Sequence, residues 1–197
     1  MLYWHAGGEI MGNGRFSGNP KTEWLSGGGD DRNMCLLESF WYIDPHGRLW
    51  EAPKGSVTNG ASIPRTLWSS IGSPYTGNYR RASIIHDVAI RTPCILRSEA
   101  DTMFYFACLA GGCAPMEGKL LYAGVRLGTW ASITREFAGD MLSMQQAAPR
   151  LPGQHAPTEL EVRARYTLLA GDLAATADNF EAIRATVERH LGPISPH

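Results

Sequence analysis

The sequence predicts an α+β fold. A small antiparallel β-hairpin or meander on the N-terminal side packs on a bundle of about three helices, and a long C-terminal helix follows. Apolar runs flank a turn at residues 44–47 that contains proline and glycine. Helix-start and helix-stop signals divide the chain between residues 80 and 130. Hydrophobic residues make up 44% of the 197 residues, which is enough for a core.

Composition divides the chain into four segments. Residues 1–33 are rich in glycine, and a short strand is expected there near Arg15–Phe16. Residues 34–144 form the core α+β domain. Residues 145–158 are rich in proline and alanine and are interpreted as a linker, whereas residues 159–191 form a heptad-like helix.

The β part of the core begins with an aromatic and aliphatic strand over Cys35–Ile43. Asp44–Gly47 is a turn, because its proline presets the second turn position and its glycine accepts a positive φ. Arg48–Glu51 is the second strand of the hairpin. Residues 57–79 are too apolar for a solvated linker, so we expect an ordered loop across the core, with a helical turn after Pro64.

Three helices are expected next. The first covers Arg80–Arg91. The second begins with Ser98 as its N-cap and ends at Gly111-Gly112, which is a helix-stop signal. The third begins at Pro115 and runs into the 120s or beyond. It carries two glycines that would let another backbone approach closely, Gly124 and Gly128.

The segment 159–191 carries a stripe of residues at spacings of three and four, which predicts one helix of about 30 residues with a heptad-like seam. The stripe consists of Val162, Tyr166, Leu169, Leu173, Thr176, Phe180, Ile183 and Val187. Such a stripe has to be buried. The helix therefore either folds back on the body or forms a coiled coil with a copy of itself or a partner protein.

Charge and composition restrict the protein's environment. The net charge of −1 provides no field that would recruit nucleic acid, so we expect no nucleic-acid partner. No run approaches the roughly 20 apolar residues of a transmembrane helix, and the N-terminus lacks a secretory signal pattern. We expect a protein that is cytoplasmic as synthesised, or exported by a signal-independent route. The four cysteines form no CxxC pair and are expected to be free thiols.

Asp101 is the first residue that points to chemistry. It shares one helix face with Phe104, Tyr105 and Cys108, which are core-type residues, so its carboxylate points toward the interior or its rim. A buried carboxylate without a partner costs several kcal/mol. Asp101 must therefore meet a cation, a metal or hydrogen-bond donors.

His86 on the preceding helix is the expected partner of Asp101. The short loop between the two helices makes them antiparallel neighbours, so the two side chains can approach each other. A histidine oriented by a carboxylate can act as a general base on water, here at the floor of a cleft that water enters. The adjacent Asp87 is free to hold a hard cation, Ca²⁺ rather than Zn²⁺. No organic cofactor is expected.

Four further residues are expected to bind substrate or to support the loop: Asn59, Ser62, Arg65 and Arg97. Ser62 lacks the G-x-S-x-G context of a nucleophile, so the loop is expected to supply backbone amides and a rigid wall. A structural interpretation stays open beside the chemical one. A buried His–Asp contact can simply join two helices, and arginines at helix ends are often solvated.

Several separated motifs carry a resemblance to a known family. They are V-T-N-G-A-S-I-P-R, then W-x-x-I-G-S-P-x-x-G-x-Y-x-R-A-x-x-x-H-D, then R-x-x-A-D-x-x-F, then L-Y-A-G-V-R-L. In this order, over residues 36–130, they resemble family 1353 of the domains of unknown function, which occurs in bacteria and phages. Asn59 stands where the family usually has Asp, and Val88 and Ile90 replace the aromatic residues that usually follow H-D.

Members of this family often lie in phage or prophage genomes near tail and lysis genes. The resemblance therefore implies a tail-associated protein or a hydrolase of the cell envelope, delivered to the envelope or to a phage particle without a signal peptide. The helix pair alone is similar to phospholipases A2. That similarity implies His86 as the base, Asp87 as the Ca²⁺ ligand and Asp101 as the orienting group, although the usual calcium loop and disulfides are missing.

Two functions follow as expectations. The first is a phage- or prophage-associated hydrolase that cleaves a phospholipid ester or a peptidoglycan amide with a His–Asp base and a metal. The second is a non-catalytic tail-associated or assembly protein, in which residues 159–191 form homo-oligomers or dock on a partner.

Overall fold

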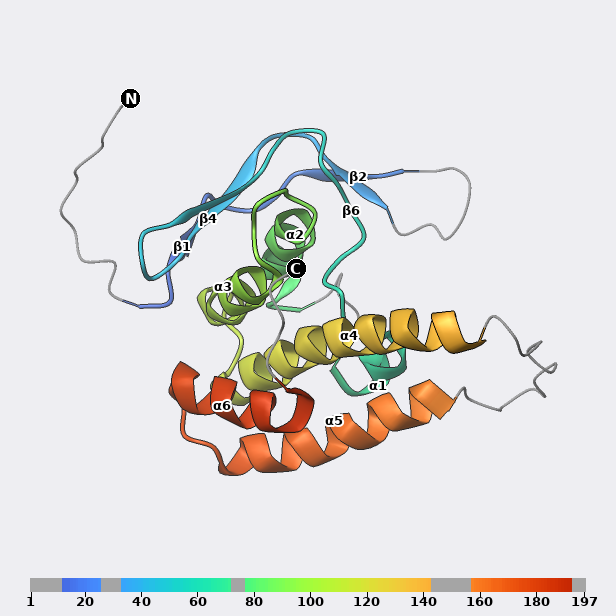
Figure 1. The fold of residues 1–197 in the computed structure, drawn as a ribbon. Helices are drawn as coiled ribbons and strands as arrows, with labels where there is room; N and C mark the ends of the chain where they lie inside the picture. The colour runs from blue at the N-terminus through green and yellow to red at the C-terminus, as the bar shows by residue number, and fades with distance from the viewer. Residues whose placement is uncertain (1–11, 26–32, 72–76, 143–156, 193–197) are drawn as a thin grey trace.

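The computed structural model describes residues 12–25, 33–71, 77–142 and 157–192. Two small sheets cover one side of the helices α2 (Arg80–Ala89) and α3 (Arg97–Ala110), and the remaining long helices lie on the other side (Figure 1). The predicted α+β class, with small antiparallel sheets on the N-terminal side and helices after them, is confirmed.

The described strands form two antiparallel sheets of three strands each. The strands are β1 (Arg15–Phe16), β2 (Thr22–Trp24), β3 (Met34–Leu36), β4 (Phe40–Ile43), β5 (Leu49–Ala52) and β6 (Val57–Thr58). In one sheet β4 lies between β1 and β5, and in the other β3 lies between β2 and β6. The strand predicted at residues 15 and 16 is therefore present.

The hairpin of β4 and β5 has the predicted turn. Gly47 has a φ of 81°, as the turn requires. Asp44 holds the turn together, because its Oδ1 accepts hydrogen bonds from the backbone N–H groups of His46 and Arg48. Its Oδ2 accepts a third one, 2.9 Å long, from the indole Nε1 of Trp50. The turn is thus joined to the strand that follows it.

The single strand predicted over Cys35–Ile43 is wrong. Residues 34–36 and 40–43 are strands of different sheets, and residues 37–39 form a bend between them. Leu36 and Phe40 are both buried, so the apolar character continues across the bend and conceals it. The polar Glu38-Ser39 step marks the place where the chain changes sheets.

The three predicted core helices are α2, α3 and α4 (Pro115–Leu142). The helical turn expected after Pro64 is present as η1 (Arg65–Leu67) and α1 (Trp68–Ile71). The prediction of Ser98 as an N-cap is wrong, since α3 begins at Arg97 and Leu96 is its N-cap. Ser98 lies in the first turn, where its carbonyl accepts a hydrogen bond from the Thr102 hydroxyl.

Gly128 confirms the predicted close approach of another backbone to α4. A Cβ atom at this position would lie 2.2 Å from the carbonyl oxygen of Ser62. The segment that begins at Ser62 therefore packs directly on the helix backbone. The equivalent role for Gly124 stays a prediction.

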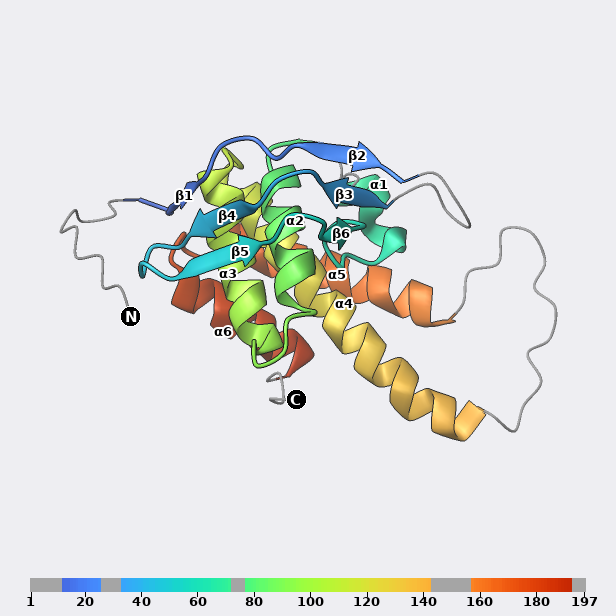
Figure 2. The ribbon, with the colours of Figure 1, turned by 90° about the horizontal axis from the view of Figure 1, so that it is seen from above.

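The single C-terminal helix predicted over 159–191 is wrong. The segment consists of α5 (Pro157–Ala175) and α6 (Phe180–Leu191). Asn179 begins the second helix, because its side chain accepts a hydrogen bond from the backbone N–H of Ala182. The two helices fold back beside α4 (Figure 2), as the first of the two alternatives proposed. Most of the apolar stripe is buried there: Val162, Tyr166, Leu169, Leu173, Ile183 and Val187.

Lys119 ties the C-terminal helices to α4. It is buried, and its ammonium group pairs with Asp178 Oδ1 at 2.6 Å. It also donates to the carbonyl oxygen of Leu173 near the end of α5. A cation at a helix C-terminus is favourable, because it complements the helix dipole.

The seam predicted to form a coiled coil is thus used within the chain. Association or docking through residues 159–191 stays a prediction, and it would need outer residues such as Leu160 and Leu168, which are exposed. The linker at 145–158 lies almost wholly outside the described residues, so the domain boundary there also stays a prediction.

All four cysteines are free thiols, as expected. Burial raises the pKa of the Cys108 thiol well above its usual range. No helix in the described part of the chain combines the length and the apolar character needed to cross a bilayer.

Candidate functional site

The predicted contact between His86 and Asp101 is present. The Nε2 atom of His86 lies 2.7 Å from Oδ1 of Asp101, and α2 and α3 are packed neighbours, as the short connection between them predicted. The imidazole also packs against the ring of Phe104, with the ring centroids 4.9 Å apart. The histidine is therefore held by a carboxylate at one nitrogen and by an aromatic ring beside it.

The second ring nitrogen of His86 is in a different situation. Nδ1 is buried and has no hydrogen-bond partner among the described residues. A neutral imidazole carries its proton on one nitrogen and accepts with the other. If Nε2 donates to Asp101, Nδ1 is the basic nitrogen.

Two arginines approach the same carboxylate. Arg97 Nε lies 3.6 Å from Oδ1 of Asp101, and Arg126 Nε lies 4.0 Å from its Oδ2. Both distances exceed a hydrogen bond, and neither Nε has a partner among the described residues. Asp101 is thus the negative centre of a cluster with two guanidinium groups and one imidazole.

The pair does not form the floor of an open cleft, as the sequence suggested. The side chains of His86 and Asp101 are both 0% exposed. The apolar residues that share the helix face of Asp101, namely Phe104, Tyr105 and Cys108, are buried as well. Of the cluster, Arg97 reaches furthest toward solvent, with 27% of its side chain exposed.

Asp87 has surroundings that suit a salt bridge. Its Oδ2 accepts a hydrogen bond of 2.8 Å from Arg91 and another of 3.0 Å from the backbone N–H of Asn59. Arg91 also donates to the carbonyl oxygen of Val57, so this network ties α2 to the end of β6. Donors, rather than further oxygen ligands, surround this carboxylate.

These surroundings do not favour a calcium ion at Asp87, because the Arg91 guanidinium and a backbone N–H already occupy Oδ2 of the carboxylate. No cluster of three or more His, Cys, Asp or Glu side chains suited to a metal occurs among residues 12–25, 33–71, 77–142 and 157–192. Ca²⁺ binding stays a prediction for experiment.

Three of the four predicted substrate-binding residues meet in one place. Ser62, Arg65 and Arg97 line a pocket of about 440 Å³, here called the loop pocket. Gly128 on α4 and Glu159 at the start of α5 complete its wall. Asn59 does not line this pocket. Its backbone N–H donates a hydrogen bond to Asp87 instead. Arg97 connects the loop pocket with the buried carboxylate.

Two residues near Asp101 were missed from the sequence, Arg126 and Tyr122. The Arg126 Nη1 atom donates a hydrogen bond of 2.8 Å to the Tyr122 hydroxyl, and both side chains are buried. The sequence feature that could have indicated them is the arginine within the apolar run L-Y-A-G-V-R-L. An arginine in such a run on a packed helix has to be paired or has to serve a site.

Fold and site together define an α+β protein with a buried His–Asp pair across an antiparallel helix hairpin. Residues 34–125 match the family described as a protein of unknown function (DUF1353), which confirms the resemblance noted from the motifs. The match contains β3 to α3 and the first part of α4, and hence His86, Arg97 and Asp101, whereas Arg126 directly follows its last residue.

Two curated relatives are uncharacterized proteins of Sinorhizobium fredii (strain NBRC 101917 / NGR234). The protein y4jT is 36% identical over 57% of this chain and 33% of its own length. The protein y4iH is 30% identical over 81% of this chain and 64% of its own length. The chain therefore spans less than two thirds of either relative. No solved structure matches the chain significantly.

Proposed function

We propose that the protein is a hydrolase that cleaves an ester or amide bond with His86 as its general base. The observation that supports this proposal is the orientation of the imidazole. Its Nε2 contacts Asp101, whereas its Nδ1 has no partner in the described part of the chain. A fixed imidazole with one available nitrogen is the arrangement that general-base catalysis needs.

In this proposal Nδ1 of His86 takes a proton from water while the water oxygen attacks the substrate carbonyl. The C–O or C–N bond then breaks, and the proton on Nδ1 passes to the leaving group. Asp101 keeps its negative charge throughout and stabilises the imidazolium that forms transiently. The Arg97 guanidinium is the nearest group that can stabilise the developing oxyanion from the solvent side.

The substrate would bind in the loop pocket. Its wall carries hydroxyl groups of Ser62, Thr66 and Ser132 beside Arg65 and Arg97, which suits a polar chain such as a peptidoglycan peptide better than an acyl chain. His86 is buried, so in this proposal substrate binding shifts Arg97 toward the carbonyl oxygen and lets water reach Nδ1. The envelope as the source of the substrate rests on the expectation from the family.

The test is an assay of the purified full chain on peptidoglycan and, separately, on phospholipid vesicles. We expect hydrolysis of peptidoglycan amides, lowered at least about 100-fold by His86→Asn, because general-base catalysis contributes roughly 10²–10⁴-fold. Parallel reactions with Ca²⁺, Zn²⁺ or a chelator test the metal prediction. Hydrolysis of the vesicles instead would assign the site to phospholipid esters.

His190→Asn is the matched control. His190 also contacts an aspartate, Asp172, at 2.8 Å, but at the surface, so its loss should leave the rate unchanged. Circular dichroism must show that each variant is folded. If His86→Asn does not fold, Arg97→Gln replaces it, since this side chain is partly exposed and its loss should also lower the rate. Full activity in these variants would exclude this site.

A further inference from the structure

A second pocket lies on the other side of the cluster. It has a volume of about 480 Å³, within the range of sites for small molecules. It lies among the β4–β5 turn, α3, α4 and α6, and is called the hairpin pocket below. Its apolar wall includes Trp50, Met103 and Phe106. No residue predicted from the sequence to bind substrate lies in it.

Arg126 is the least compensated arginine in the hairpin pocket. Its side chain is only 3% exposed, yet it lines the pocket. Of its five N–H donors, one has an acceptor among the described residues, the Tyr122 hydroxyl. Its Nε is buried without a partner, 4.0 Å from Asp101. A buried guanidinium in this state carries a large desolvation penalty.

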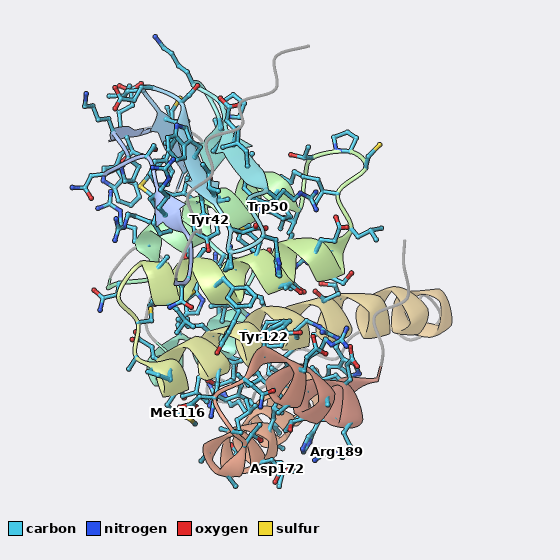
Figure 3. All side chains as sticks on the ribbon, turned by 90° about the vertical axis from the view of Figure 1, so that its left-hand side faces the viewer. Tyr42, Trp50, Met116, Tyr122, Asp172 and Arg189 are labelled. Atoms are coloured by element: carbon cyan, nitrogen blue, oxygen red, sulfur yellow. The ribbon has the colours of Figure 1, made fainter. Side chains whose placement is uncertain are left out.

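The neighbours of Arg126 do not balance its charge. Burial raises the pKa of Tyr122 to about 12, more than the nearby Arg126 lowers it, so the phenol is neutral at physiological pH. Asp101 supplies one negative charge to two guanidinium groups, those of Arg97 and Arg126. Counting Asp101, Arg97 and Arg126 alone, the cluster carries one surplus positive charge. Figure 3 shows Tyr122 between α3 and α6, where the pocket lies.

The other arginines of the hairpin pocket already have carboxylate partners. Arg48 pairs with Glu99 at 3.1 Å and lies over the ring of Trp50. Arg184 pairs with Glu181 at 2.7 Å. Asp44, although acidic, uses both carboxylate oxygens to accept hydrogen bonds from the turn and from Trp50. Glu188 also lines the pocket and adds a negative charge near Tyr122. Arg126 is therefore the one arginine in the lining of this pocket without a carboxylate at hydrogen-bond distance among the described residues.

We propose that the hairpin pocket binds a small molecule that carries a carboxylate group and an apolar body. The carboxylate pairs with the guanidinium of Arg126, whose planar fork matches two carboxylate oxygens, and the apolar body lies against Met103 and Phe106. This site is separate from the loop pocket and does not depend on the hydrolase activity.

Benzoate is a suitable probe, because it combines a planar carboxylate with an apolar ring. Benzamide is its neutral analogue of the same shape, and inorganic phosphate is an anion of different shape. Binding to the full chain is followed by isothermal titration and by shifts in amide NMR spectra. We expect saturable benzoate binding, weakened at least tenfold by Arg126→Met, and no binding of benzamide or phosphate at the same concentration.

Ser98→Trp is a second variant that leaves the buried charges in place. Ser98 lines the hairpin pocket, so a large side chain there should also weaken benzoate binding at least tenfold. This variant decides the question if Arg126→Met does not fold. Absence of benzoate binding, equal binding by both variants, or equal binding of phosphate would overturn the proposal.

Discussion

Replacing Asp101 with alanine is expected to lower the free energy of unfolding by about 3–5 kcal/mol, because removing one partner of a buried ionic pair leaves the other uncompensated. The loss is large here because one carboxylate serves several groups. Among the described residues, the His86 imidazole loses its only hydrogen-bond partner, and Arg126 loses the one acidic side chain within 4.0 Å. Urea unfolding followed by circular dichroism measures the change.

The protein contains its own control for this experiment. Asp172 contacts His190 at 2.8 Å, nearly the same distance as in the buried pair, but the Asp172 side chain is 52% exposed. Figure 3 labels Asp172 at the surface formed by α5 and α6, near Arg189. Asp172→Ala should cost at most about 1 kcal/mol, as exposed pairs do. Equal losses for Asp101→Ala and Asp172→Ala would contradict the role assigned to burial.

Gly128→Ala is expected to destabilise the protein by about 1–3 kcal/mol, the usual cost of overpacking. The new methyl group would lie 2.2 Å from the Ser62 carbonyl oxygen, so the loop and α4 would have to separate. Because Ser62 and Gly128 line the same pocket, the variant should also change the amide NMR signals of residues 62–66. Thermal unfolding and NMR spectra measure the two effects.

Gly171→Ala is expected to change the stability in the opposite direction. Gly171 lies within α5, and a Cβ there would meet nothing within 4 Å. The substitution should therefore stabilise the protein by about 0.5–1 kcal/mol, the usual difference between glycine and alanine inside a helix. If Gly128→Ala were also stabilising, the close packing of the Ser62 segment on α4 would be wrong.

Local chemistry explains which elements were predictable. The turn at residues 44–47 follows from the conformations of proline and glycine, and α3 ends at Gly111-Gly112, where Gly112 has a φ of 102°. The inward positions of His86 and Asp101 follow from helical spacing, and their contact follows from the short loop between the helices. These inferences needed only neighbours in sequence.

The remaining features depend on distant parts of the chain. The apolar stripe keeps its spacing across the break between α5 and α6, so periodicity concealed the break, although Asn179 is a good N-cap residue. The covering of the His–Asp pair depends on how the helices pack. The donors that surround Asp87 come from Arg91 and from the loop at Asn59, a pairing that no local pattern indicates.

The proposed hydrolysis depends on the position of one proton, because His86 can act as a base only if Nδ1 is unprotonated. Long-range ¹H–¹⁵N NMR spectra of the folded protein report the protonation of both ring nitrogens. We predict that the neutral imidazole of His86 carries its proton on Nε2, directed at Asp101, because Nε2 is the nitrogen that contacts the carboxylate. A neutral ring with its proton on Nδ1 would contradict the role of His86 as the base.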